Sequence, residues 1–123
     1  MEKPVRVLVV EDDDDINRLL CGVLTRSGYI PQPAYSGTEA LLYLDRQVWS
    51  LVLLDLMLPG LRGEELLAAI GAKGDTPVIV ITAENERETK IAALKTGADD
   101  YVTKPFDLEE VSARVDSLLR RFR

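Results

Sequence analysis

The chain has 123 residues with 21 acidic and 15 basic side chains, a formal charge of −6, no histidine and one cysteine. This length fits one domain, and a 46% hydrophobic composition is enough to bury a core. The missing histidine excludes Ser-His-Asp and Cys-His catalysis, His-ligated zinc or iron, and a phosphohistidine on this chain. The single Cys21 excludes an internal disulfide and a cysteine-rich metal site.

The sequence also limits location and partners. Its first residues, Met-Glu-Lys-Pro, lack the basic and apolar regions of a signal peptide, and apolar runs such as Val7–Val10 are far shorter than a membrane span. We therefore expect a cytoplasmic protein without a membrane partner. The acidity also argues against nucleic-acid binding by this domain itself, because such binding depends on neutralising phosphates. Most of the charge excess lies in one run, Glu11–Asp15.

Apolar runs alternate with helical periodicity along the first part of the chain. Val5–Val10 is rich in β-branched residues and predicts a buried strand. The next segment predicts an amphipathic helix that ends near Gly28. Tyr29–Ala34 predicts a weak strand at the sheet edge, because it contains two prolines. The apolar stripe of the predicted helix consists of Ile16, Leu19, Leu20, Val23 and Leu24.

The same alternation continues to the C-terminus. A helix opening at Ser36 precedes Leu51–Leu54, the most apolar strand and the predicted centre of the sheet, and Leu58-Pro59-Gly60 predicts a turn. The remaining predicted elements are a helix over Glu64–Lys73, a strand over Pro77–Ile81, a helix over Glu86–Lys95, a strand over Asp100–Val102 and a helix over Leu108–Phe122.

Five strand–helix pairs predict an α/β fold in which helices cover both faces of a parallel sheet. The usual arrangement for five such pairs is the doubly wound, flavodoxin-like (βα)5 fold with strand order 2-1-3-4-5. We expect residues 1–123 to form this single domain. In this order ligands bind beyond the carboxyl ends of the strands, at the switch point between the first and third strands.

Three carboxylates follow the strands at this switch point. Glu11 and Asp12 follow the first strand and Asp55 follows the third. Because neighbouring strands lie ~4.8 Å apart, we expect these acids to converge and to repel one another unless a cation binds. With oxygen ligands only, the expected ion is Mg²⁺, or Mn²⁺ as a similar hard metal. One of residues 13–15, all aspartates, is predicted to cap the following helix.

A hydroxyl and an ammonium follow the remaining two strands. Thr82 comes after the fourth strand and Lys104 after the fifth. A metal, a lysine and a hydroxyl suit the oxygens of a phosphoryl group, and Asp55 is the candidate nucleophile for an acyl phosphate. Taken alone, Thr82 would be read as a helix cap and Lys104 as a surface lysine. Their joint placement at strand ends favours the phosphoryl site.

Four sequence blocks resemble the receiver domain of two-component response regulators. They are Val9–Asp13, Leu53–Gly60, Ile81–Ala83 and Gly97–Phe106, and the resemblance extends over nearly the whole chain. It implies that Asp55 accepts a phosphoryl group from the phosphohistidine of a separate sensor histidine kinase. It also implies that the chain is no enzyme beyond its own Mg²⁺-dependent phosphorylation and autodephosphorylation.

The resemblance assigns further roles around the phosphoacceptor. Asp12 would ligate Mg²⁺ beside Asp55, Glu11 would act mainly through a bound water, and the backbone carbonyl of Met57 would complete the protein ligands. Lys104 would pair with the phosphoryl oxygens, and its bond to Pro105 is expected to be cis.

The family also implies a switch and an output. Thr82 would turn toward the new phosphoryl group while Tyr101 swings inward and repacks the surface formed by the last two helices and the strand between them. The final third resembles the winged-helix (OmpR/PhoB-like) subfamily, whose members dimerise through this surface and control transcription. The alternative is a stand-alone receiver that acts by protein–protein interaction. The implied ion pairs across the dimer are Lys90 with Glu110, Asp100 with Arg114, and Asp99 with Arg121.

Three other functions are alternatives to that of a receiver domain. A flavin or nucleotide binder of the same fold would need a phosphate-binding loop after the first strand, where Glu11–Asp15 would repel phosphate. A phosphatase of the haloacid dehalogenase type would need a second acid two residues after its nucleophile, where this chain has Met57. A phosphate-independent interaction module is disfavoured because every acceptor and switch residue is present.

Overall fold

Five parallel strands form one sheet in the order β2-β1-β3-β4-β5 in the computed structural model, which describes residues 3–122. The strands are β1 (Arg6–Val10), β2 (Ile30–Ala34), β3 (Leu51–Leu54), β4 (Val78–Thr82) and β5 (Asp100–Thr103). The helices are α1 (Asp14–Arg26), α2 (Gly37–Arg46), α3 (Gly63–Ala72), α4 (Arg87–Thr96) and α5 (Leu108–Arg121). The predicted doubly wound α/β class and strand order are confirmed. Met1, Glu2 and Arg123, at the ends of the predicted domain, lie outside the described residues.

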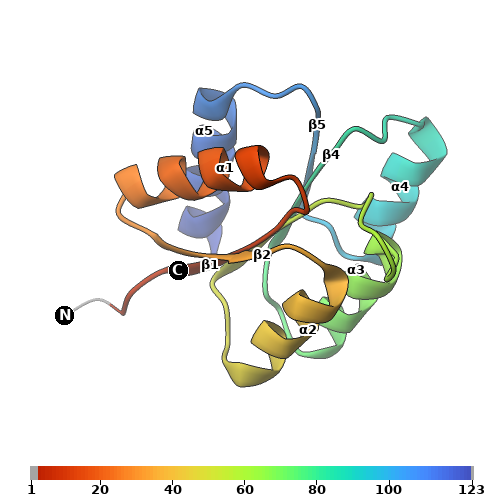
Figure 1. The fold of residues 1–123 in the computed structure, drawn as a ribbon, viewed down its shortest axis with the longest axis horizontal. Helices are drawn as coiled ribbons and strands as arrows, with labels where there is room; N and C mark the ends of the chain where they lie inside the picture. The colour runs from red at the N-terminus through yellow and green to blue at the C-terminus, as the bar shows by residue number, and fades with distance from the viewer. Residues whose placement is uncertain (1–2, 123) are drawn as a thin grey trace.

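Alternate residues of the strands face two separate layers of helices (Figure 1). In β1, Val7 and Val9 point to a core shared with α1 and α5, whereas Leu8 and Val10 point to a core shared with α2, α3 and α4. Every residue of the central strand β3 is buried, as expected for a strand covered on both faces. Within the described part of the chain, no helix is long and apolar enough to cross a bilayer.

Local capping groups set the beginnings of the first two helices. Asp13 is the predicted aspartate cap of α1, and its Oδ1 accepts a hydrogen bond from the Ile16 amide at 3.0 Å. Ser36 caps α2 by accepting from the Glu39 amide at 3.1 Å. Gly28 follows α1 with a φ of +89°, the left-handed conformation that favours glycine after a helix.

Several element boundaries differ by one residue from those predicted. β4 begins at Val78 instead of Pro77, since proline has no amide hydrogen for the ladder, and it ends with Thr82 inside the strand. β1 begins after Val5, and β5 extends to Thr103. The helices α3 and α4 are likewise displaced by one residue from the predicted ranges. These differences leave the order of the predicted elements unchanged.

The apolar stripe of α1 is rotated from the predicted one. Leu20 and Leu24 are buried as expected, but Leu19 is 52% exposed. Asn17 is fully buried and takes the place on the core-facing side that the prediction gave to Leu19. The prediction of Leu19 as a core residue was wrong. Asn17 and Leu19 both lie within one turn of Leu20, and the prediction considered only the apolar residue as part of the buried stripe.

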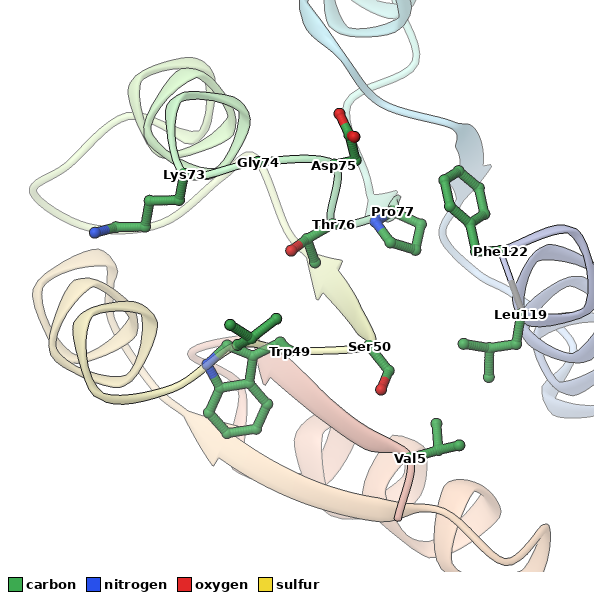
Figure 2. Close-up of a pocket in the computed structure, with 11 residues that line it drawn as sticks. Val5, Trp49, Ser50, Lys73, Gly74, Asp75, Thr76, Pro77, Leu119 and Phe122 are labelled. Carbon is green, nitrogen blue, oxygen red and sulfur yellow. The ribbon is translucent and has the colours of Figure 1, made fainter. Parts of the chain in front are cut away.

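A hollow lies at the edge of the sheet where the strands begin (Figure 2). It is lined by residues that precede β1, β3 and β4, among them Val5, Ser50 and Pro77, and by Phe122 after α5. Its volume is about 400 Å³. Because all five strands are parallel, this edge is opposite to the one where their carboxyl ends lie. The polar residues of the predicted site therefore belong to the other edge.

Candidate functional site

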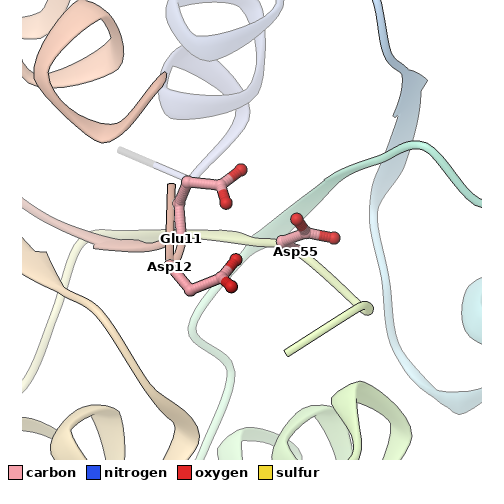
Figure 3. A group of neighbouring side chains, drawn as sticks. All are labelled: Glu11, Asp12 and Asp55. Carbon is pink, nitrogen blue, oxygen red and sulfur yellow. The ribbon is translucent and has the colours of Figure 1, made fainter. Parts of the chain in front are cut away.

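Three carboxylates meet where β1 and β3 end (Figure 3). Val10 pairs with Leu54 across the two strands, so the next residues, Glu11 and Asp55, leave the sheet at the same height. One carboxylate oxygen each from Glu11, Asp12 and Asp55 lies within 4.8 Å of the other two. The strand register thus brings together the three acids that the sequence places after these strands.

One ammonium lies between the two buried acids. Glu11 and Asp55 are only 2% and 4% exposed, and Lys104 Nζ lies 2.5 Å from Glu11 Oε1 and 2.8 Å from Asp55 Oδ2. Burial raises the pKa of Glu11, and the hydrogen bond from Lys104 opposes this rise. Burial alone would lower the pKa of Lys104, but its hydrogen bonds and charge attraction to the two acids outweigh that effect and raise it. The lysine therefore stays positively charged beside both carboxylates.

The other site residues lie on neighbouring strand ends. The Met57 amide donates to Asp55 Oδ1 at 2.9 Å, so both carboxylate oxygens of Asp55 are held. Thr82, at the end of β4, is fully buried, and its Oγ1 accepts from the Glu84 amide at 3.3 Å. Helix α4 begins at Arg87, so Thr82 is a strand residue and does not cap that helix.

The donor set around this cluster consists of oxygen atoms. Carboxylates and backbone carbonyls at a strand end are ligands that Mg²⁺ prefers, whereas a softer metal would favour imidazole or thiolate. When the three acids are ionised, the single charge of Lys104 leaves the cluster with a net negative charge. The residues present therefore fit a hard divalent cation beside Asp55.

The profile of the response regulator receiver domain family matches residues 7–116. The chain belongs to this family. The recognition made from the four sequence blocks is thus confirmed, and the receiver domain occupies nearly all of the chain.

Curated relatives and solved structures agree with this assignment. The receiver domain is 43% identical over 117 residues to "Regulatory protein VanRc" from Enterococcus gallinarum, covering 95% of this chain and 51% of that protein. It is 40% identical over 116 residues to "Response regulator ArlR" from Staphylococcus aureus, covering 94% of this chain and 53% of that protein. The chain thus spans about half the length of these relatives.

Among solved structures, the receiver domain of the Francisella response regulator 1452 has 35% sequence identity and a TM-score of 0.90, covering 98% of this chain and all of that one. A BeF3-activated DrrB receiver domain has 33% identity and a TM-score of 0.88, covering 96% of this chain and 99% of that one. A CheY-like receiver from Methanospirillum hungatei has 27% identity and a TM-score of 0.92, with 97% and 96% covered. These neighbours confirm the receiver fold over nearly the whole chain.

Two backbone features mark the receiver's loop after β5. The Lys104–Pro105 peptide bond is cis, as the resemblance implies. The Lys104 amide donates to the Thr82 carbonyl at 2.8 Å, which ties the end of β5 to the end of β4. This bond positions the lysine side chain over the strand ends.

Asn17 is a site residue of this receiver that the sequence analysis missed. Its Nδ2 donates to the carbonyl of Glu11 at 3.0 Å and lies 3.3 Å from that of Val9 and 3.5 Å from that of Ala34. The side chain therefore satisfies backbone oxygens just where β1 turns into the acidic segment. The signal was a polar residue on the core-facing stripe of an amphipathic helix, because a buried polar group needs partners.

Replacing this side chain is expected to destabilise the receiver. Asn17→Ala leaves the Glu11 carbonyl without its donor and creates a cavity, so the free energy of unfolding should fall by about 2 kcal/mol. Urea denaturation measures this change. Gln47→Ala, at an exposed position after α2, is the control and should stay within about 0.5 kcal/mol of the parent. Equal stability of the two variants would contradict the role given to Asn17.

Tyr101 lies inward in this structure of the receiver. Its side chain is buried, its hydroxyl donates to the Glu84 carbonyl at 2.7 Å, and Lys90 Nζ lies 5.8 Å from its ring centroid. Burial raises the pKa of its phenol, and the negative charges of Glu84 and Asp55 add to this rise. Tyr101 thus connects β5 to the loop that follows Thr82.

The raised pKa of Tyr101 predicts a late step in an alkaline titration. Subtracting the tyrosinate absorbance of Tyr101→Phe from that of the parent should leave a component with a midpoint above ~10. Because the folded-state pKa lies above the unfolded one, this phenol stabilises the fold below the unfolded pKa, and the stabilisation is lost as pH rises through the folded value. A difference component at or below the ordinary tyrosine pKa would contradict the buried, hydrogen-bonded placement.

Four of the six predicted dimer-face residues of the receiver have partners within the same chain. Arg114 contacts both oxygens of Asp100, at 2.8 and 3.0 Å, and binds Glu110 at 3.0 Å. Asp99 accepts from the Val78 amide at 2.8 Å. The predicted pairing of Asp100 with Arg114 therefore exists here inside the protomer. The pairing of these residues, of Lys90 and of Arg121 across a dimer stays a prediction.

Proposed function

We propose that this receiver accepts a phosphoryl group on Asp55 from the phosphohistidine of a sensor histidine kinase. The observation that carries the proposal is the placement of Asp55, buried at the end of the central strand with Lys104 on one carboxylate oxygen and two further acids beside it. A buried carboxylate held by one ammonium is oriented for attack on phosphorus. The protein would act in the cytoplasm.

The chain's own residues would perform distinct tasks in this transfer. An oxygen of Asp55 would attack the phosphorus and form an acyl phosphate, while the P–N bond to the kinase histidine breaks and its imidazole leaves. Lys104 would shift from the carboxylate to the phosphoryl oxygens. Asp12, Asp55, the Met57 carbonyl and, through water, Glu11 would hold Mg²⁺. That ion, when bound, supplies charge neutralisation for the phosphoryl oxygens. Water attack on the same phosphorus would later return the free carboxylate, and no other enzymatic activity is proposed.

The switch would involve the residues that join β4 to β5. The buried hydroxyl of Thr82 would turn to donate to a phosphoryl oxygen and so release the Glu84 amide. The segment after Thr82 also holds the hydroxyl of Tyr101 through the Glu84 carbonyl. A shift of this segment would therefore favour one position of Tyr101 over another, which is a change in the populations of two states of the α4–β5–α5 face.

The output would be dimerisation through the α4–β5–α5 face to control a transcriptional domain. The support is the cluster of charged residues on that face and the roughly twofold greater length of the curated relatives, one of which is named a regulatory protein. The alternative is a stand-alone receiver acting by protein–protein interaction. Sedimentation of loaded and unloaded protein at tens of micromolar separates the two: a dimer on loading supports the first, and a persistent monomer supports the second.

Loading by a small phosphodonor tests the proposed function without the kinase. Incubation with acetyl phosphate should add one phosphoryl group when Mg²⁺ is present and none after chelation of the metal. Beryllium fluoride, which mimics the acyl phosphate, should bind with the same Mg²⁺ dependence. Equal phosphorylation with and without Mg²⁺ would contradict the proposed metal site.

A further inference from the structure

Gly63, the first residue of α3, lies directly against the backbone of Leu56. A β-carbon placed on Gly63 would lie 2.4 Å from the Leu56 Cα, 2.7 Å from its Cδ2 and 2.9 Å from its carbonyl oxygen. Real β-carbons essentially never approach other atoms this closely, and a contact with backbone cannot be relieved by a rotamer change. The requirement for glycine here comes from space, because its φ is not positive.

The residue that Gly63 contacts lies inside the proposed site. Leu56 connects Asp55 to Met57, and the Met57 amide donates to Asp55 Oδ1 at 2.9 Å. The position of the Leu56 backbone therefore sets both this hydrogen bond and the direction of the Met57 carbonyl. Leu56 is buried, so it has little room to move away from α3.

A second glycine contact holds the other end of the same loop. A β-carbon on Gly37, the first residue of α2, would lie 2.7 Å from the Leu61 Cβ. This contact is with a partly buried side chain instead of backbone, and it lies farther along the chain from Asp55. It should therefore constrain the loop less strongly than Gly63 does.

We propose that Gly63 is a positioning residue for the aspartyl-phosphate site. Without a side chain, it lets the start of α3 rest on the Leu56 backbone, and that contact holds the turn from Asp55 to Met57 in the form that orients the carboxylate and presents the carbonyl to a metal. The proposal rests on the function proposed above, since it concerns the same metal site.

The variant Gly63→Ala tests the proposal by two measurements on the intact chain. Isothermal titration calorimetry should show a Kd for Mg²⁺ raised by about tenfold or more, the scale seen when a group that supports metal ligands is lost. Hydrogen exchange of the Met57 amide, measured by NMR without metal, should become faster because its bond to Asp55 loosens. The matched control is Gly71→Ala on the same helix, where a β-carbon would meet nothing within 4 Å, and both values should stay at those of the parent.

A second pair of variants separates positioning from a general loss of stability. Val115→Ala removes buried volume from the core shared with α1 and α5, and it should lower stability while leaving the Mg²⁺ affinity of the folded protein unchanged. If Gly63→Ala does not fold, Gly37→Ala provides the test, with an expected rise in the Kd for Mg²⁺ that stays below about tenfold, a weaker effect of the same kind.

The proposal would be overturned if Gly63→Ala keeps both the Mg²⁺ affinity and the Met57 amide exchange rate of the parent. When Gly37→Ala has to be used instead, parental Mg²⁺ affinity in that variant would overturn it. A parent that binds no Mg²⁺ would instead contradict the proposed function. In that case exchange at Met57 still tests Gly63, because that measurement needs no metal. Faster exchange of the Met57 amide in Gly63→Ala would support the role of the contact between Gly63 and Leu56 in holding the turn. An unchanged exchange rate would overturn that role.

Discussion

Asp55→Asn is expected to abolish phosphorylation by small phosphodonors and by a sensor kinase. An amide nitrogen does not replace the carboxylate as nucleophile, so the labelling rate should fall by at least about 10³-fold, the scale of losing a group that the reaction needs. Phosphate-affinity gel electrophoresis of samples treated with acetyl phosphate measures this loss. The effect should not come from unfolding, because asparagine keeps the size of the side chain, and its amide oxygen can still accept from one of the two donors, Lys104 or the Met57 amide.

An exposed aspartate provides the control for this loss. Asp45 lies on α2 and pairs with Lys73 at 2.5 Å, away from the carboxyl ends of the strands. Asp45→Asn should therefore label at the parental rate. Labelling of Asp55→Asn at a rate similar to that of Asp45→Asn would show that another residue is the phosphoacceptor.

Lys104→Met is expected to destabilise the metal-free protein strongly. It removes the ammonium that lies within 2.8 Å of both Glu11 and Asp55, and it leaves two buried carboxylates facing each other. Loss of one partner from a buried ion pair costs about 3–5 kcal/mol, so urea denaturation at neutral pH should show a loss on the order of 3 kcal/mol. Added Mg²⁺ should recover part of this loss, because the cation replaces the missing positive charge.

The pH dependence of Lys104→Met follows from the raised pKa of Glu11. Burial already raises this pKa in the parent, and loss of the lysine hydrogen bond removes the largest of the effects that oppose the rise. A carboxyl whose folded-state pKa lies above its unfolded value stabilises the fold below the unfolded pKa, and this contribution is lost as pH rises through the folded pKa. The variant should therefore lose more stability than the parent as the pH rises above the ordinary glutamate pKa of about 4.5.

An exposed lysine serves as the comparison for Lys104. Lys95 lies in the last turn of α4, where its interaction with the helix dipole is worth less than about 1 kcal/mol. Lys95→Met should therefore change stability little and show no added pH dependence. If Lys104→Met behaves like Lys95→Met in the absence of metal, the lysine does not neutralise the buried acids.

Much of the site could be predicted because it depends on topology. Once alternating strands and helices are recognised, the parallel strand order places Glu11, Asp12 and Asp55 at one edge, and the register confirms that the strands bearing them end together. Thr82 and Lys104 follow from the same reasoning, since β4 and β5 are the next strands in the sheet. Such placement requires only the period of the pattern and the rule for parallel sheets.

What the sequence did not reveal depends on packing between elements. Asn17 instead of Leu19 faces the core because the rotation of α1 on the sheet is set by tertiary contacts, which helical periodicity leaves uncertain by part of a turn. The close approach of Gly63 to Leu56 could not be predicted either, because the spacing of residues in the sequence does not determine how closely the start of α3 packs on the loop after β3. Arg114 binds within its own chain for a similar reason, because α5 packs where its side chain can reach Asp100.

Chemical mapping of the phosphorylated residue tests directly whether Asp55 is the phosphoacceptor. Borohydride reduces an aspartyl phosphate to homoserine, and peptide mass spectrometry then identifies the modified position. After treatment with acetyl phosphate and Mg²⁺, we expect homoserine at position 55 and no such conversion when Mg²⁺ is chelated. Homoserine at another acidic position, with Asp55 left intact, would contradict the assignment of Asp55 as the phosphoacceptor.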